Sequence, residues 1–150
     1  MSILISASRP AGIFYGLQSL KQLLPPVSAS KNPAEQGPIL IQGSRIRDFP
    51  RFQWRGLMLD VSRHFFGVED VKSYLDKMSE YKFNVFHWHL TDDEGWRIEI
   101  MSLPELTLTG DWRVERSGRF GDQRPRPAEG DEARYGGFYT HADISEIVHY

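Results

Sequence analysis

The segment FHWHLTDDEGWRIEI, residues 86–100, combines two histidines, three consecutive acids and two tryptophans. Histidine and carboxylate side chains bind metal ions or move protons, and tryptophan faces line binding pockets. His87 and His89 lie two residues apart, so on a strand both rings point to one face, as a metal pair requires. A pair alone lacks further ligands, and Asp92 and Asp93 would have to fold back from the strand end. Two histidines hydrogen-bonded within the packing are the simpler interpretation.

Two apolar runs with a helix between them are predicted to position these residues. The runs WRGLMLDVS (54–62) and NVFHWHL (84–90) have the length and composition of buried strands. VEDVKSYLDKMSEYKF (68–83) has apolar residues at helical spacing and acids at its front, which predicts an amphipathic helix. The apolar face of this helix comprises Val71, Tyr74, Leu75, Met78 and Tyr81. A strand, a helix and a strand in this order predict a βαβ unit with parallel strands.

The carboxyl ends of parallel strands meet at one rim, where α/β folds place their sites. DVSRHFF follows the first strand and TDDEGW the second, so we expect Arg63 and His64 to face the same cleft as Asp92. Arginine donors and carboxylate acceptors hydrogen-bond hydroxyls, and aromatic faces stack on the apolar side of a pyranose ring. The rim therefore favours a sugar as ligand. Candidate stacking residues are Trp96, Trp112, Tyr135 and Tyr139.

The flanking segments are less regular. GIFYGLQSLKQLLP (12–25) predicts a helix with Phe14, Leu17, Leu20 and Leu24 on one face, ended by Pro25-Pro26. A loop and an extended stretch follow, so a domain boundary is expected between residues 25 and 50. Residues 101–137 carry too many prolines and charges for regular elements and read as a long, function-bearing excursion. Thr140 is the predicted N-cap of a last helix, with Asp143 three residues on.

Composition excludes several function classes. The 150 residues are 40% hydrophobic and 25% charged, which is typical of a globular protein. A net charge of -2 without a basic run argues against nucleic acid as a partner. The start has neither a signal peptide nor a membrane span, which predicts a cytoplasmic protein if Met1 is the true start. Two strands and one and a half helices cannot cover a parallel sheet, so we expect a piece of a larger protein.

The longest motif resembles a known family. RGLMLDVSRHFFGVEDVKSYLDKMSEYKFNVFHWHLTDDEGWRIEI (55–100) closely resembles the start of the catalytic barrel of glycoside hydrolase family 20, the β-N-acetylhexosaminidases. YGGFYTHADISEIVHY resembles the family's second helix and its approach. AGIFYGLQSLKQLLP resembles the last helix of the small α/β domain before that barrel. The resemblance implies an α/β fold: the first two βα units of a partial (β/α)8 TIM barrel at 51–150, a linker at 27–50 and the end of the small domain at 1–26.

The resemblance also implies a reaction. It is the retaining hydrolysis of terminal N-acetylglucosamine or N-acetylgalactosamine from glycans or chito-oligosaccharides, without metal or cofactor. The sugar's 2-acetamido oxygen attacks the anomeric carbon, a glutamate protonates the leaving oxygen, and a neighbouring aspartate orients the acetamido group. Arg63 is implied to hold the hydroxyls at the far end of the terminal sugar. Asp92 is implied to support catalysis through a hydrogen-bond chain that tunes the glutamate. His87 and His89 become scaffold, and Trp96 with Arg97 fixes the rim.

No residue of the chain matches the family's catalytic acid, the Glu of a Gly-Asp-Glu motif that ends a later strand. The GDE at 130–132 is rejected, because prolines and charges precede it and exclude a buried strand. Glu69-Asp70 is rejected because it belongs to the first turn of a helix. The catalytic Asp-Glu pair is therefore expected beyond Tyr150, and the 150 residues alone are expected to be inactive.

Two other function classes stay open on the residues. One is a metal-dependent barrel hydrolase that uses His87 and His89, and the other is a non-catalytic carbohydrate-binding remnant. The oligomeric state, the choice between the two N-acetylhexosamines and the compartment are not readable. The resemblance suggests an exported or lysosomal protein, although no signal is visible in the chain.

Overall fold

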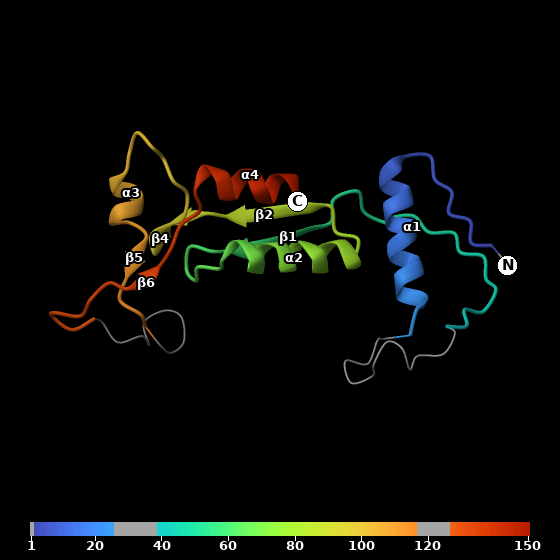
Figure 1. Ribbon diagram of the computed structural model, residues 1–150, viewed down its shortest axis with the longest axis horizontal. Helices are drawn as coiled ribbons and strands as arrows, with labels where there is room; N and C mark the ends of the chain where they lie inside the picture. Colours follow the sequence, from blue (N-terminus) through green and yellow to red (C-terminus); the bar gives the residue numbers. More distant parts are fainter. Residues whose placement is uncertain (1, 26–38, 117–126) are drawn as a thin grey trace.

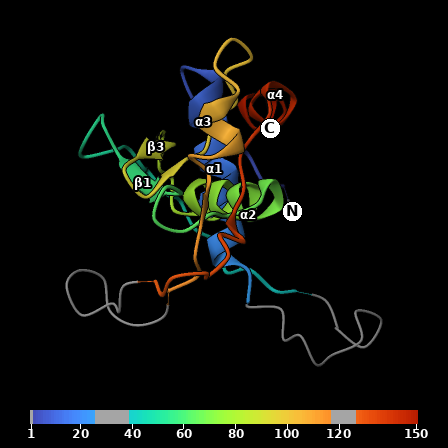
Figure 2. The same cartoon turned by 90° about the vertical axis from the view of Figure 1, so that its left-hand side faces the viewer.

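The centre of the protein is a pair of parallel strands. The computed structural model describes residues 2–25, 39–116 and 127–150. Strand β1 (Gly56–Asp60) pairs in parallel with β2 (Val85–His89), and helix α2 (Val68–Glu80) connects them. The predicted βαβ unit is therefore confirmed. Helix α4 (His141–His149) lies on the same side of the strand pair as α2, as Figure 2 shows, with an ion pair between Lys72 and Glu146.

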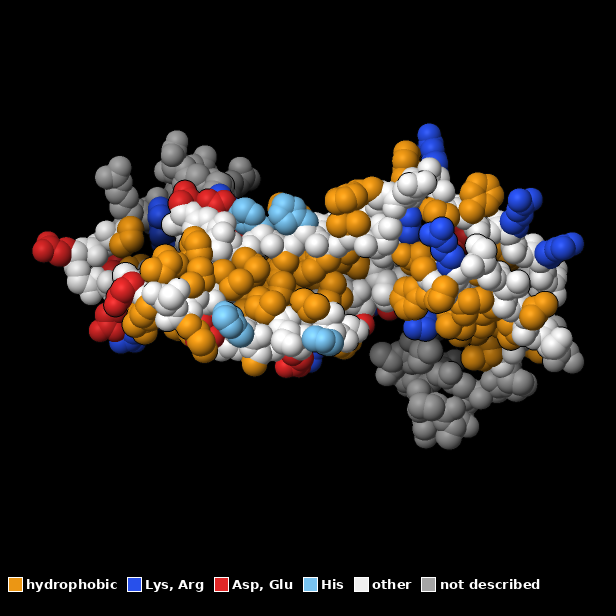
Figure 3. Space-filling view, turned by 90° about the horizontal axis from the view of Figure 1, so that it is seen from above, with side chains coloured by type: hydrophobic (Ala, Val, Ile, Leu, Met, Phe, Trp, Pro, Cys, Tyr) orange, Lys and Arg blue, Asp and Glu red, His pale blue; other side chains and the backbone are white. Residues whose placement is uncertain are grey.

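The core lies between the strand pair and these two helices. Side chains from β1, β2, α2 and α4 meet there, so both helices cover the same face of the strands. The opposite face is open among the described residues, where Met58 is 54% exposed and His87 is also exposed. Seen from above, hydrophobic side chains also form a band along the middle of the surface on the α4 side (Figure 3). The buried members of the core are Val61, Val71, Tyr139 and Ile147, packed against partly buried Leu59, Phe86, Trp88 and Ile144.

Helix α2 is shorter than its apolar pattern predicts. It ends at Glu80 rather than at residue 83, because Lys82 has a positive φ of 62° and breaks the helical path. Tyr81, expected on the apolar face, is exposed at the C-cap. At the other end, the Asp70 carboxylate accepts the Gly67 N–H at 3.0 Å, which stabilises the first turn. Glu69 and Asp70 thus act in the helix, as expected.

Helix α4 begins as the sequence predicts. The Thr140 hydroxyl oxygen accepts the Asp143 N–H at 3.2 Å, and the Asp143 carboxylate accepts the Thr140 N–H at 2.8 Å. This reciprocal pair satisfies two of the free N–H groups at the helix start.

The prediction that residues 101–137 hold no regular elements is wrong. A one-turn helix, α3 (Glu105–Leu108), is followed by β5 (Trp112–Arg113), which pairs antiparallel with β6 (Tyr135–Gly136). A second small antiparallel hairpin pairs β3 (Thr91–Asp92) with β4 (Gly95–Trp96). Strands of two residues are too short to show alternation in a sequence. Figure 2 views the molecule from the end that carries these elements.

Helix α1 (Pro10–Leu23) confirms the predicted first helix. Figure 1 shows it at the opposite end of the molecule from β3–β6. Its expected apolar face is largely exposed, and only Gln18 is buried. It is tied to the rest through Gln22, which donates to the Glu80 carbonyl at 3.0 Å, and through Tyr15, whose ring lies 5.3 Å from the Arg55 guanidinium. Among the described residues, no helix has the length and apolarity needed to cross a membrane.

Candidate functional site

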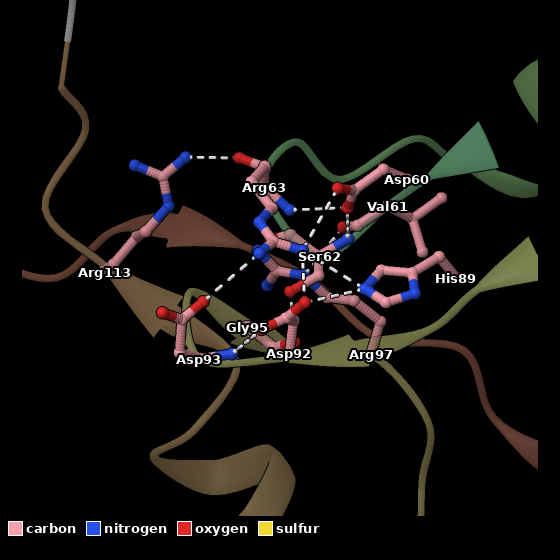
Figure 4. Close-up of polar contacts among 10 residues, drawn as sticks. All are labelled: Asp60, Val61, Ser62, Arg63, His89, Asp92, Asp93, Gly95, Arg97 and Arg113. Carbon is pink, nitrogen blue, oxygen red and sulfur yellow. Dashed lines mark hydrogen bonds and ion pairs between the residues drawn. The ribbon is translucent and has the colours of Figure 1, made fainter. Parts of the chain in front are cut away.

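The carboxyl ends of β1 and β2 bring the predicted rim residues together. Asp60 lies opposite His89 in the parallel register, so the turns that follow both residues emerge side by side. Arg63 comes from the first turn and Asp92 from the second, and the Arg63 Nη1 contacts the Asp92 carboxylate directly (Figure 4). The expected convergence at one rim is what the structure shows.

Arg63 is held along one side of its guanidinium. Nη1 also lies 3.2 Å from Asp60 Oδ2 and 3.2 Å from His89 Nε2. Nη2 lies 3.6 Å from Asp93 Oδ1, which is beyond hydrogen-bond distance. The Asp93 side chain is 80% exposed. The acids therefore fix the direction of the guanidinium, with Asp93 as the ion-pair partner on the Nη2 side.

The ion pair at the rim is fully charged at neutral pH. The pKa of Asp92 lies far below its ordinary value, because its carboxylate accepts the Asp93 N–H and interacts with His89 and Arg63. Burial works to lower the pKa of Arg63, but the hydrogen bond to Asp92 and the charges of Asp60, Asp92 and Asp93 outweigh it, and the net shift is upward. A general acid must hold a proton before the reaction. Asp92 is thus an anchor and hydrogen-bond acceptor rather than a proton donor.

The histidine pair takes different environments. His89 Nε2 lies 2.8 Å from Asp92 Oδ2, so its ring is engaged in the rim network. His87 is exposed on the open face of the strands, and the two ring centroids are 6.1 Å apart. In the described part of the chain, no three side chains of His, Asp or Glu are grouped to hold a metal ion. The geometry there supplies no ligand set for the metal-dependent alternative.

The turn that carries Arg63 is held by Asp60, the last residue of β1. Asp60 Oδ1 accepts the N–H groups of Ser62 and Arg63 at 3.0 and 3.1 Å. The Ser62 hydroxyl donates to the Gly95 carbonyl at 2.9 Å, which joins this turn to the β3–β4 hairpin. The turn after β1 and the turn after β2 therefore form one unit.

Arg97 lies under this unit with 0% of its surface exposed. Its Nε donates to the Val61 carbonyl at 3.0 Å and its Nη2 to the Ser62 carbonyl at 2.8 Å. Its Nη1 donates to the carbonyls of Asp111 and, at 3.3 Å, Gly137. Burial lowers the pKa of Arg97. Its position fits the rim-fixing role that the family resemblance implied, and no pattern in the sequence marks a buried arginine.

Asp111 is the buried acid beside Arg97, and sequence reasoning missed it. It is 0% exposed, and its Oδ1 lies 3.9 Å from Arg97 Nη1. Neither carboxylate oxygen has a hydrogen-bond partner among the described residues. Burial raises the pKa of Asp111 to about 6, although the charge of Arg97 opposes the shift. Asp111 is closed to a substrate and its ionised form is poorly stabilised.

His64, expected to face the same cleft as Asp92, forms its hydrogen bond with Tyr135 and not with the Asp92 network. It shares a hydrogen bond with the Tyr135 hydroxyl through Nδ1, and its ring packs on Phe66 at 4.9 Å. Tyr135 lies under Arg113, whose guanidinium is 4.6 Å from the ring centroid. The Arg113 Nη2 donates to the Arg63 carbonyl at 2.6 Å. Sequence reasoning gave Arg113 no role.

The candidate stacking residues are only partly available. Tyr139 is 0% exposed, packs at the centre of the core and donates to the Phe66 carbonyl, so its proposed stacking role is wrong. Trp96 is half-buried and donates to the Ile98 carbonyl at 2.8 Å. Trp112 is 41% exposed and is the most open of the four.

The rejected GDE segment is a surface turn. Gly130 has a φ of 93°, and Asp131 Oδ2 accepts the Ala128 N–H at 2.8 Å. Asp131 and Glu132 are exposed, and neither belongs to a strand. This placement agrees with rejecting the segment as the end of a buried strand.

Comparisons with known proteins point in one direction. The sequence profile described as "Glycosyl hydrolase family 20, catalytic domain" matches residues 52–150. A beta-hexosaminidase of Porphyromonas gingivalis is 45% identical over 139 residues, which cover 93% of this chain and 16% of that protein. A beta-hexosaminidase of Vibrio furnissii is 43% identical over 148 residues, which cover 99% of this chain and 22% of that protein. The chain thus spans less than a quarter of the length of these relatives.

Solved structures give the same result. Streptomyces plicatus N-acetyl-beta-hexosaminidase in complex with Thio-NAglucal matches with a TM-score of 0.75 at 46% identity, over 96% of this chain and 26% of that one. Vibrio harveyi GH20 exo beta-N-acetylglucosaminidase in complex with N-acetylglucosamine matches with a TM-score of 0.69 at 38% identity, over 95% of this chain and 21% of that one.

Proposed function

The chain belongs to glycosyl hydrolase family 20, and we propose that it supplies part of the sugar-binding rim of a β-N-acetylhexosaminidase. The observation that carries this proposal is the contact between Arg63 and Asp92 at the carboxyl ends of β1 and β2. The pair offers a guanidinium edge and an ionised carboxylate on one rim. Such groups hydrogen-bond the hydroxyls of a pyranose.

The same proposal covers the fold. Residues 51–150 form the first two βα units of a (β/α)8 barrel, residues 1–26 end a small α/β domain, and 27–50 link the two. Support comes from the parallel strand pair with both helices on one face. The other face exposes Met58 and His87, which would line a barrel interior once further strands close it. The apolar band seen in Figure 3 is further surface for such elements to cover.

The reaction is the retaining hydrolysis of a terminal N-acetylglucosamine or N-acetylgalactosamine residue from a glycan or chito-oligosaccharide. The 2-acetamido oxygen of the sugar attacks its own anomeric carbon as the bond to the leaving oxygen breaks. A glutamate gives its proton to that oxygen, and water then opens the cyclic intermediate with the original configuration restored. The sugar supplies the nucleophile, so the reaction needs no cofactor. Because the reacting groups share one molecule, much of the orientation cost is already met.

In this scheme Arg63 binds the terminal sugar, and Asp92 supports the catalytic glutamate. Arg63 Nη2 donates to the hydroxyls at the far end of the terminal sugar, because Nη1 is already engaged with three rim partners. Asp92 stays ionised and passes a hydrogen-bond chain toward the catalytic glutamate. Neither Asp92 nor the enclosed Asp111 suits the role of proton donor. We therefore place the catalytic Asp-Glu pair on residues other than these 150.

The test is hydrolysis of p-nitrophenyl N-acetyl-β-glucosaminide and its galactosaminide by the whole protein that carries this chain. Loss of a charged hydrogen-bond donor in Arg63→Met should raise KM by about 10- to 100-fold. Asp92→Asn should lower kcat and move its pH profile. Arg134→Met removes an arginine that is 81% exposed and serves as the control. Kinetics like those of wild type in both rim variants would refute the residue assignments.

The two alternatives make different predictions for the same protein. A metal-dependent hydrolase that uses His87 and His89 would lose activity in chelator and retain zinc after purification. A carbohydrate-binding remnant would bind N-acetylglucosamine without releasing p-nitrophenol. Full activity in chelator, with turnover of the chromogenic substrate, excludes both.

A further inference from the structure

We propose that Arg113 is a positioning residue for Arg63: it fixes the backbone from which the sugar-binding guanidinium extends. The inference rests on the proposed function, because it names what keeps Arg63 in its binding position. It assigns a role to the β5–β6 ribbon (112–113 with 135–136), which is part of the excursion that connects β4 to α4.

The first step is that arginines hold three consecutive carbonyls of the Arg63 turn. The carbonyls of Val61 and Ser62 accept from Arg97 at 3.0 and 2.8 Å. The carbonyl of Arg63 itself accepts from Arg113 Nη2 at 2.6 Å (Figure 4). Arg97 is anchored in the interior, whereas Arg113 reaches the turn from the ribbon. Arg113 is thus the contact nearest to the side chain that binds the sugar.

The second step is that Arg113 has its own support. It is the direct cross-strand partner of Tyr135, so both side chains leave the ribbon on the same face. Its guanidinium lies over the Tyr135 ring, 4.6 Å from the centroid. The Tyr135 hydroxyl in turn hydrogen-bonds His64, the residue after Arg63. The contacts therefore close a loop that holds the turn at both Arg63 and His64.

The third step is that the ribbon approaches the turn as closely as glycine permits. Within the ribbon region, a Cβ at Gly136 would lie 2.0 Å from the carbonyl oxygen of Asp111, which directly precedes β5, so the ribbon itself is tightly closed. A Cβ at Gly137, whose φ is 148°, would lie 2.5 Å from Phe65 Cε1. Arg97 also donates to the Gly137 carbonyl at 3.3 Å. The ribbon is thus packed against the turn rather than hanging free in solvent.

These contacts divide the control of Arg63 between two groups. The rim acids and His89 orient the guanidinium, and Arg113 fixes the backbone end of the side chain. Small displacements of a binding group weaken its interactions with a ligand. Loss of Arg113 should therefore weaken sugar binding through Arg63 and leave the bond-breaking step largely unchanged.

The decisive experiment is a double-mutant cycle in the whole protein, after wild-type hydrolysis has been established. Arg113→Met should raise KM by about tenfold, equal to about 1.4 kcal/mol, with kcat within about twofold of wild type. In the Arg63→Met background the same change should have almost no effect, because Arg113 acts through Arg63. If Arg113→Met raises KM by the same factor in the wild-type and the Arg63→Met backgrounds, the proposal is overturned. The KM of Arg113→Lys should lie between those of wild type and Arg113→Met, because lysine restores a donor but not the planar stack on Tyr135.

A second measurement does not depend on activity. Amide hydrogen exchange in the peptide that spans residues 61–65 should be faster in Arg113→Met than in wild type, and unchanged in the exposed control Arg134→Met. Unchanged exchange in the Arg113 variant overturns the positioning role even if the enzyme is active. A wild-type protein that neither binds nor hydrolyses N-acetylhexosaminides refutes the proposed function, whatever the exchange data show. If Arg113→Met does not fold, Arg113→Lys carries both measurements.

Discussion

Replacing Asp111 by asparagine should stabilise the protein at neutral and alkaline pH, although it removes one partner of a buried ion pair. Asp111 is 0% exposed, and both of its carboxylate oxygens lack hydrogen-bond partners in the described part of the chain. Asparagine has the shape of the protonated acid and carries no charge. The change therefore removes the cost of burying a poorly solvated carboxylate.

The pKa shift sets the size of the effect. Burial raises the pKa of Asp111 from 3.8 to about 6, even with the opposing charge of Arg97. Each pKa unit is worth about 1.4 kcal/mol, so the ionised folded state is less stable by up to about 3 kcal/mol. Because the folded state binds more protons than the unfolded state between about pH 4 and 6, stability falls as pH rises through this window and is level above it.

Arg97 does not reverse this expectation. Its Nη1 lies 3.9 Å from the Asp111 carboxylate, whereas its donors are bonded to four carbonyl oxygens. Its hydrogen bonds therefore survive in Asp111→Asn. The converse variant, Arg97→Met, leaves these carbonyls without a donor and Asp111 without a cation, so we expect it to lose about 3–5 kcal/mol.

Urea unfolding followed by tryptophan fluorescence, at several values from about pH 4 to about pH 8, measures this difference. The free energies of unfolding of wild type and Asp111→Asn should agree at the acid end and diverge by about 2–3 kcal/mol at the alkaline end. An asparagine variant that is less stable than wild type at the alkaline end, with an unchanged pH dependence, would refute the reasoning. It would mean that the attraction between Asp111 and Arg97 exceeds the desolvation cost.

Two further predictions concern backbone geometry. Gly136→Ala places a Cβ 2.0 Å from a backbone oxygen that cannot move aside easily, so thermal unfolding should show a loss of about 1–3 kcal/mol, and a wild-type melting temperature would contradict the close approach. Thr140→Ala removes the acceptor for the Asp143 N–H at the start of α4 and should cost about 1 kcal/mol in urea unfolding, whereas Thr140→Ser should be close to neutral.

The elements with a regular apolar pattern over many residues could be predicted from the sequence. The apolar runs around β1 and β2 and the periodic helix between them determine a parallel pair, and parallel strands deliver Arg63 and Asp92 to one rim. The end of α2 could not be predicted, because the apolar pattern continues to Tyr81 while the backbone turns at Lys82. The backbone leaves the helical path at a point where the apolar pattern of the sequence still continues.

The residues that hold the rim were harder to foresee. Arg97 was named only through the family resemblance and Arg113 was not named at all, because both bind carbonyl groups, and a backbone carbonyl can belong to any residue type. Tyr139 was expected at a sugar surface but fills the core, because its hydroxyl finds a carbonyl partner there. His64 turns to Tyr135, a residue more than seventy positions away. Such pairings depend on how the excursion folds back, which short strands do not reveal.

Three arginines, Arg63, Arg97 and Arg113, hold the rim together. Replacement by lysine should be tolerated to a different degree at each of them. Arg97 donates to four carbonyls from three nitrogens, and a lysine, with three donors on one atom, would leave at least one of these buried carbonyls unpaired. Arg113 uses a single bond together with its flat face on Tyr135, so lysine would keep part of its contribution. Arg63 divides its two terminal nitrogens between partners, with Nη1 on Asp60, Asp92 and His89 and Nη2 at 3.6 Å from Asp93, and a single ammonium group does not allow this division. Lysine should therefore be tolerated best at position 113. The free energy of unfolding measures the effect of Arg97→Lys, and KM measures the effects of Arg63→Lys and Arg113→Lys.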